Sequence, residues 1–258
     1  MGASSFAHTY VWCVWCVWCL QVRQYQQQIS RTCLFHNTLV SLPTGLGKTL
    51  IAAVVMYNFH RWYPKGKIIF CAPTRPLVTQ QIEACYNIMG ISQQVTAEIT
   101  GKTNKDARAK LWADHNVFFC TPQTLDNDIN ENKNFNVDEV VCLVLDEAHK
   151  AKGDYAYVKV IRGLTMSNAR FRVVGLSATP GADKDSINEV FQNLRIDKLE
   201  ARTDDDPDVK QYIHEKNVQV SRAPVWRSET GEARPTLAKR ERRRRSETDA
   251  GEARPTPA

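Results

Sequence analysis

A glycine-rich loop that ends in lysine and threonine is the segment of this sequence best suited to hold phosphate. It follows a short β-branched run at residues 38–42. In such a loop the glycines let the backbone approach phosphates and direct N–H groups at them, while the lysine reaches the β- and γ-phosphates and the threonine hydroxyl binds Mg²⁺. Leu42 replaces the first glycine of the strict G-x-x-x-x-G-K-T pattern, but the T-G-x-G-K-T form after a strand still predicts an ATP and Mg²⁺ site. Its residues would be Pro43, Thr44, Gly45, Leu46, Gly47, Lys48 and Thr49.

Two adjacent carboxylates, Asp146 and Glu147, form the second group that could do chemistry. They directly follow the apolar run at residues 140–145. A buried strand of this kind would deliver them to the sheet edge beside the glycine-rich loop. There Asp146 would hold Mg²⁺, directly or through water, and Glu147 would orient and deprotonate an attacking water. Asp-Glu-Ala-His alone could also be a polar strand end with a helix cap, so its place after the loop and the buried run is what indicates catalysis.

A turn of small residues, Ser177-Ala178-Thr179, follows the apolar run at residues 172–176. By itself this turn would say little. Together with the loop and the carboxylates it fits a P-loop ATPase whose third motif couples the nucleotide state to nucleic acid. A P-loop GTPase or a small-molecule kinase would not account for these segments in this order, and the sequence has no N-K-x-D guanine-reading motif.

Short β-branched runs alternate with helical patterns through the middle of the chain, and these elements must position the three motifs. Buried strands are predicted at residues 38–42, 67–72, 95–99, 117–120, 140–145 and 172–176, with helices at 48–59, 76–89, 105–113 and 155–166. This alternation predicts an α/β fold with a mostly parallel sheet and helices on both faces. Ligands of such folds bind beyond the C-terminal ends of the strands, which is where the three motifs fall.

Both ends of the chain differ from this middle. Val-Trp-Cys is repeated three times at residues 11–19, and its C-x-x-C spacing could suggest a metal site, but no fourth ligand is evident and low complexity explains it. The polar tail contains an arginine run, residues 242–245, that could be a nuclear-import signal, a phosphate-binding arm or a solvated charge run. We therefore predict a low-complexity segment (1–20), an ATP-binding domain (21–220) and a disordered basic repeat tail (221–258).

Composition and charge are those of an ordinary globular protein, with 43% hydrophobic and 24% charged residues. The net charge of +6 falls mostly in the basic tail, so charge alone does not indicate a nucleic-acid partner. Scattered cysteines in apolar runs indicate reduced, buried thiols rather than a disulfide framework. The apolar run at residues 10–20 is too short to span a bilayer, and no membrane segment is expected.

The order of the motifs, T-G-x-G-K-T, P-T-R-P-L, T-P-Q, D-E-A-H and S-A-T, resembles that of superfamily-two helicases and translocases. Three longer stretches, residues 37–49, 76–85 and 146–151, resemble the Fanconi anaemia group M family of DNA-remodelling ATPases. The resemblance covers about residues 21–220. It implies a RecA-like P-loop domain of an ATP-dependent DNA helicase or translocase in the nucleus. Such a protein would act on forked or branched DNA in DNA repair, with proteins of DNA-repair complexes as partners.

The resemblance also implies roles for residues that would say little by themselves. Arg23 and Gln26 would belong to an adenine-reading motif, with Gln26 on the base edge, and His149 would link the hydrolysis site to the Ser177–Thr179 turn. A plain helix-start histidine would fit the same position. Contacts to the phosphate backbone of one strand are implied for Pro73, Thr74, Arg75, Thr100, Gly101, Thr121, Pro122 and Gln123. Hydroxyls, loop N–H groups, helix N-termini and an arginine suit phosphates rather than base edges, although ordinary loop and capping residues look the same.

Two other interpretations stay open at this point. An RNA-directed superfamily-two ATPase would carry the same motifs. A non-catalytic nucleotide- or DNA-binding fragment is the second, because no further parallel α/β unit with an arginine-finger helix is found after Val220. For that reason the isolated chain is expected to bind ATP and Mg²⁺ weakly, with little turnover of its own.

Overall fold

A seven-stranded, entirely parallel sheet forms the centre of the computed structural model, which describes residues 22–131, 135–167, 170–179 and 184–212. The strand order is β3-β4-β2-β5-β6-β1-β7. The strands are β1 (Thr38–Ser41), β2 (Lys67–Cys71), β3 (Thr96–Ile99), β4 (Val117–Cys120), β5 (Val140–Leu145), β6 (Arg172–Ser177) and β7 (Lys198–Ala201). The predicted end segments, 1–20 and 221–258, lie outside the described residues.

The α/β fold and the parallel sheet predicted from the sequence are confirmed. β4 and β5 have the predicted bounds, and the other four predicted strands differ from the prediction by one residue at one end. β7 is absent from the prediction. It is an edge strand that pairs only with β1, and Lys198 and Leu199 are exposed, so it lacks the apolar run that marks a buried strand.

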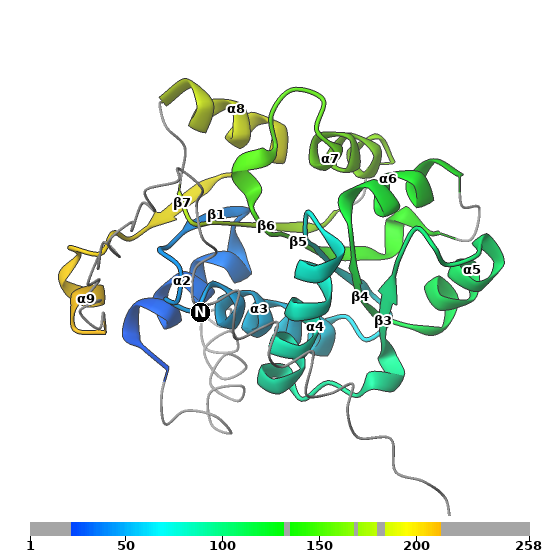
Figure 1. Cartoon of the computed structure of the whole chain (residues 1–258), viewed down its shortest axis with the longest axis horizontal. Coiled ribbons are helices and arrows are strands. Elements are labelled where there is room, and N and C mark those ends of the chain that lie inside the picture. Colours follow the sequence, from blue (N-terminus) through cyan, green and yellow to red (C-terminus); the bar gives the residue numbers. More distant parts are fainter. Residues whose placement is uncertain (1–21, 132–134, 168–169, 180–183, 213–258) are drawn as a thin grey trace, which may run out of the picture. The chain divides into compact units, whose positions relative to one another are not determined.

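Helices cover both faces of the sheet (Figure 1). One face packs against α2 (Gln24–Phe35), α3 (Lys48–Trp62), α4 (Arg75–Met89) and the short α9 (Pro207–Lys210), and the other against α5 (Lys105–Asp114), α6 (Pro122–Glu131), α7 (Ala156–Met166) and α8 (Lys184–Leu194). Three 3₁₀ helices complete the described elements: η1 (Gln93–Val95), η2 (Val137–Glu139) and η3 (Ala148–Lys150). The four predicted helices are all present. Of the helices that the structure describes, none has the length and apolar character needed to cross a membrane.

Neighbouring residues of each central strand enter opposite cores. In β2, Ile68 and Phe70 pack beneath α3 and α4, whereas Ile69 and Cys71 pack on the other face. Both faces therefore require apolar side chains, which is why these strands read as continuous apolar runs. The five described cysteines are buried and free, as expected, and burial raises the pKa of Cys33 to about 12. The Cys33 thiol therefore stays protonated, and buried thiols of this kind pack as small hydrophobic groups.

The parallel arrangement places the C-terminal ends of all strands along one edge of the sheet. β1 leads into the glycine-rich loop and α3, β5 ends directly before Asp146, and β6 ends at Ser177. β5, β6 and β1 are consecutive neighbours in the sheet. The strand order therefore brings together three segments that are far apart in the sequence.

A buried ionic cluster connects α5 to α6. Asp128 accepts a hydrogen bond from Trp112 Nε1 at 2.9 Å, and Arg108 Nη2 lies 3.2 Å from the other oxygen of the same carboxylate. The Asp128 side chain is only 1% exposed, and this burial raises its pKa. Because water hardly reaches the pair, each charge depends on the other for compensation.

Asp128→Ala should lower the free energy of unfolding by about 3–5 kcal/mol, since it leaves Arg108 buried without its carboxylate. Urea unfolding followed by tryptophan fluorescence measures the change. Glu131→Ala is the matched control, because Glu131 pairs with Lys105 on the surface at 2.8 Å, and it should leave the unfolding midpoint almost unchanged. Equal midpoints for Asp128→Ala and the parent would contradict the importance of the cluster.

Candidate active site

The glycine-rich loop turns tightly between β1 and α3. Gly45 and Gly47 have φ angles of 89° and 85°, a conformation that side chains with a Cβ rarely adopt. Lys48, the first residue of α3, donates from Nζ to the carbonyls of Leu42 at 2.6 Å and Pro43 at 3.1 Å. The ammonium group thus lies inside the loop, at the N-terminus of α3. Backbone N–H groups at a helix N-terminus favour anions, as the ammonium group itself does. Burial lowers the pKa of Lys48, while Asp146 and Glu147 act in the opposite direction.

Asp146 is a buried carboxylate fixed on several sides at the end of β5, with 7% of the residue exposed. Its N–H donates to the Cys71 carbonyl at 2.9 Å, and its own carbonyl accepts from the Tyr157 hydroxyl at 2.5 Å. Its Oδ1 accepts from the Glu147 N–H at 3.0 Å. Burial raises the pKa of the carboxyl group, which the Glu147 N–H and the Lys48 ammonium partly offset. A cation beside Asp146 would further favour the charged form.

Gln81 connects the two residues predicted to hold Mg²⁺, and the sequence prediction did not include it. Thr49 Oγ1 donates to Gln81 Oε1 at 3.0 Å, and Gln81 Nε2 donates to Asp146 Oδ2 at 3.4 Å. The hydroxyl of Thr49 and the carboxylate of Asp146 therefore converge on one amide group. Both are oxygen ligands of the kind that Mg²⁺ prefers, so the donor set fits this ion. Nothing in the helical pattern of α4 distinguishes Gln81 from Gln80.

Glu147 adopts a left-handed backbone conformation with φ 52° and ψ 44°. This region is costly for a residue with a side chain, and such strain is found most often at functional sites. The turn starts η3 directly after Asp146 and leaves the Glu147 side chain partly exposed. Two adjacent carboxylates thereby have different surroundings, one buried and one open to solvent.

His149 connects these carboxylates to the turn after β6. Its Nδ1 lies 3.0 Å from Ser177 Oγ and 3.5 Å from Glu147 Oε2. Ser177 Oγ also bonds to the Thr179 carbonyl and accepts from the Thr179 N–H at 3.3 Å, which closes the turn around Ala178. The Ser177 carbonyl accepts from the Leu42 N–H at 3.1 Å. The structure thus brings all three motifs into one hydrogen-bonded network.

The predicted adenine motif lies against the glycine-rich loop at the start of α2. Gln26 Nε2 and the Tyr25 hydroxyl both donate to the Leu46 carbonyl, at 3.1 Å and 2.8 Å. Gln26 Oε1 accepts from the Arg23 N–H at 3.1 Å. A Cβ on Gly47 would collide with the Gln26 amide, so glycine is required there. Both ends of this amide bond within the chain, and its contact with a base stays a prediction.

The residues predicted to contact nucleic acid lie after three neighbouring strands, in loops and at the starts of α4 and α6. They are Pro73, Thr74 and Arg75 after β2, Thr100 and Gly101 after β3, and Thr121, Pro122 and Gln123 after β4. β3, β4 and β2 are adjacent in the sheet. A Cβ on Gly101 would lie 3.6 Å from Arg75 Nη2 and 3.9 Å from Thr124 Oγ1, so the starts of α4 and α6 meet the loop after β3 at Gly101.

Hydroxyl groups and helix N-termini gather where these loops meet. The hydroxyls of Thr121 and Thr124 lie 3.0 Å apart, and those of Thr100 and Thr103 lie 3.1 Å apart. α4 begins at Arg75 and α6 at Pro122, so two helices have their N-termini at this edge of the sheet. Hydroxyl groups and helix N-termini suit phosphates rather than base edges, and the contact with nucleic acid stays a prediction.

The chain is similar in sequence to known helicases and to Fanconi anaemia group M proteins. Over 204 residues the chain is 52% identical to the "Fanconi anemia group M protein homolog" of Mus musculus, which covers 79% of this chain and 10% of that protein. Over 196 residues it is 50% identical to the "ATP-dependent DNA helicase fml1" of Schizosaccharomyces pombe, which covers 76% of this chain and 23% of that protein. The chain thus spans less than a quarter of the length of these two relatives. The resemblance to Fanconi anaemia group M proteins is confirmed.

The solved Hef helicase domain of Pyrococcus furiosus has the same fold, with a TM-score of 0.71 and 38% identity over 76% of this chain and 41% of that one. This likeness confirms the RecA-like architecture of the described sheet and helices. Residues 23–187, more than half of the chain, match the family model described as DEAD/DEAH box helicase. The chain therefore belongs to the DEAD/DEAH box helicase family.

Proposed function

We propose that this chain is the ATP-binding domain of an ATP-dependent DNA helicase or translocase that acts on forked or branched DNA in nuclear DNA repair. The observation that carries the proposal is the convergence of Thr49 and Asp146 on Gln81 beside the Lys48 ammonium. The loop offers N–H groups and a cation for phosphates, and the two oxygens offer ligands for a metal ion. Relatives whose names include DNA helicase support DNA as the polymer.

The glycine-rich loop and the residues after β5 would act together on the triphosphate. Lys48 would leave the carbonyls of Leu42 and Pro43 and bind the β- and γ-phosphates, and the loop N–H groups would complete the anion site. Thr49 and Asp146 would hold Mg²⁺, which when bound neutralises charge on the phosphate oxygens. Glu147 would orient a water molecule and accept its proton. His149 would link Glu147 to the Ser177–Thr179 turn, because its ring contacts both Glu147 and Ser177.

The nucleic-acid strand would lie across the edge formed by the loops after β2, β3 and β4. Arg75 supplies the one cation among the predicted contact residues, and the threonine hydroxyls and helix N-termini supply neutral donors. Contacts of this kind carry no sequence information. A protein that moves along DNA needs such contacts, because it must bind every sequence.

Lys48→Ala should abolish measurable ATP binding, because it removes the cation that faces the triphosphate. Isothermal titration with ATP and Mg²⁺ measures the affinity. Lys65→Ala is the matched control, since Lys65 is exposed in the turn between α3 and β2, at the end of α3 away from the loop. Equal ATP affinity of Lys48→Ala and the parent would refute the assignment of the loop.

Gln81→Ala should weaken ATP binding about threefold to tenfold in the presence of Mg²⁺, because Thr49 and Asp146 lose the amide group that holds them together. ATP binding in excess chelator should change much less, since the loop itself is intact. The neighbouring Gln80→Ala is the control, because Gln80 is exposed. A loss of the same size with and without Mg²⁺ would argue against a role of Gln81 at the metal.

Arg75→Ala should weaken DNA binding about equally for unrelated sequences and reduce the salt dependence of binding by about one phosphate contact. Fluorescence anisotropy with labelled single-stranded and forked DNA at several salt concentrations measures both quantities. Arg61→Ala, at the end of α3 distant from these loops, is the control. The same titration with RNA of equal sequence tests the RNA-directed alternative, which tighter binding to RNA than to DNA would favour.

A further inference from the structure

Arg23 is held in place by aromatic residues on two sides. Its Nη1 donates to the Tyr25 hydroxyl at 3.0 Å, and the same hydroxyl donates to the Leu46 carbonyl of the glycine-rich loop. Its guanidinium carbon lies 4.6 Å from the centre of the Tyr212 ring. Arg23 is partly exposed, whereas Gln26 is buried and uses both ends of its amide within the chain. Arg23 is therefore the residue of this group that can present a flat polar surface to a ligand beside the loop.

Tyr212 comes from the other end of the described chain. It follows α9, and its N–H donates to the Val209 carbonyl at 2.8 Å. Val209 is fully buried in the core shared by α2 and α3. The Tyr212 ring also lies 6.0 Å from the Tyr25 ring at an angle of 53°. Since α9 is anchored by a buried side chain, the Tyr212 ring has a fixed position over the Arg23 guanidinium.

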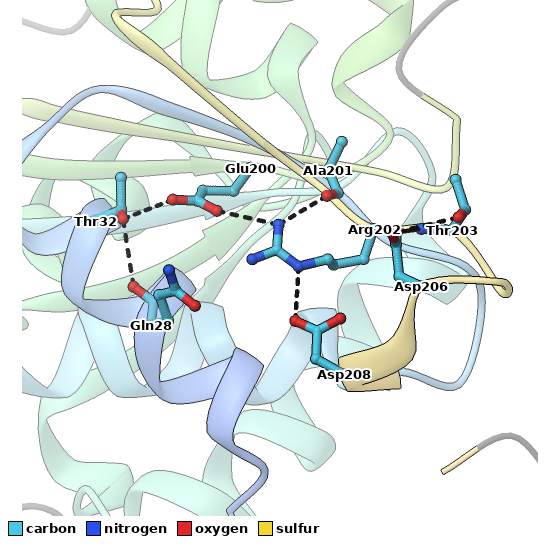
Figure 2. Close-up of polar contacts among 8 residues, drawn as sticks. All are labelled: Gln28, Thr32, Glu200, Ala201, Arg202, Thr203, Asp206 and Asp208. Carbon is cyan, nitrogen blue, oxygen red and sulfur yellow. Dashed lines mark hydrogen bonds and ion pairs between the residues drawn. The ribbon is translucent and has the colours of Figure 1, made fainter. Parts of the chain in front are cut away.

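A polar network ties α9 to the sheet edge and to α2, as Figure 2 shows. Thr32 Oγ1 on α2 donates to Glu200 on β7 at 2.7 Å. Arg202 lies between two carboxylates, with Nε 2.9 Å from Asp208 and Nη1 3.5 Å from Glu200. The Arg202 side chain is only 19% exposed, so this arrangement is partly shielded from water. The network fixes the entry into α9, and through α9 it fixes Tyr212.

We propose that residues 198–212 are a positioning element for base recognition, in which Tyr212 orients the Arg23 guanidinium toward the adenine of bound ATP. This inference rests on the proposed function, because it requires a triphosphate in the glycine-rich loop. Guanidinium groups stack on aromatic rings and on nucleobases alike. A guanidinium fixed by Tyr212 and Tyr25 is already ordered, so a base that stacks on it loses less conformational freedom on binding.

The test compares ATP with inorganic tripolyphosphate, which has the phosphates but no base. In titrations with the full chain and Mg²⁺, Tyr212→Ala should raise the Kd for ATP about threefold to tenfold and leave the Kd for tripolyphosphate within about twofold. Tyr212→Phe keeps the aromatic ring, so its affinity for ATP should equal that of the parent chain. Arg202→Ala should act in the same direction as Tyr212→Ala with a smaller effect. Tyr63→Ala is the matched control, because Tyr63 is an exposed tyrosine at the far end of α3.

Three results would overturn the inference, and they differ from one another. Unchanged ATP affinity in Tyr212→Ala would show that the ring does not act on the base. Equal losses for ATP and tripolyphosphate would show that residues 198–212 only support the fold of the loop. A parent chain that binds neither compound would overturn the proposed function and this inference with it.

Discussion

The buried carboxylate of Asp146 is the group on which the arrangement of the site depends. It ends the central strand β5, and its backbone is fixed by Cys71 on β2 and by Tyr157 on α7. Its two side-chain oxygens have separate partners, the Glu147 N–H and the Gln81 amide. A carboxylate in such surroundings is costly unless charges or hydrogen bonds compensate it. A nearby cation reduces this cost, and the Lys48 ammonium group acts in this way on Asp146.

The rest of the site follows from how the sheet holds Asp146. β6 and β1 lie next to β5 in succession, so the turn after β6 and the glycine-rich loop after β1 lie along the same edge. Ser177 bonds to both sides: its carbonyl accepts from Leu42 and its hydroxyl contacts His149. These contacts connect the glycine-rich loop to His149 and Glu147. On the other side of β5, the adjacent strands β2, β4 and β3 carry the loops proposed for the nucleic acid.

Much of this could be predicted from the sequence, for a physical reason. The central strands are covered by helices on both faces, so their residues form apolar runs that are easily recognised. The glycine-rich loop, Asp146 and Glu147, and the Ser177–Thr179 turn directly follow those runs, because a parallel sheet presents its ligand-binding groups at the strand ends. Gly45 and Gly47 could be predicted from the T-G-x-G-K-T pattern because both have positive φ angles that favour glycine, and because Gln26 leaves no room for a Cβ at Gly47.

Other parts of the site could not be predicted, because they depend on contacts between distant segments. Gln81 acts through its place beside Thr49 and Asp146, and no periodicity in α4 marks it. Tyr212 lies far along the chain from Arg23, and β7, which leads to it, is a polar edge strand without an apolar run. The hydrogen bond from Gln26 to Leu46 is also a tertiary feature, since it requires the Leu46 carbonyl to face α2.

A crystal structure of the chain with Mg²⁺ and a non-hydrolysable ATP analogue would test directly whether Lys48 binds the phosphates and whether Thr49 and Asp146 hold the metal ion. We expect Lys48 Nζ to leave the carbonyls of Leu42 and Pro43 for the β- and γ-phosphates. We also expect Mg²⁺ to lie between the Thr49 hydroxyl and Asp146, with Gln81 keeping its hydrogen bond to one of them. A nucleotide bound elsewhere, or phosphates in the loop while Lys48 keeps both carbonyl bonds, would contradict these expectations.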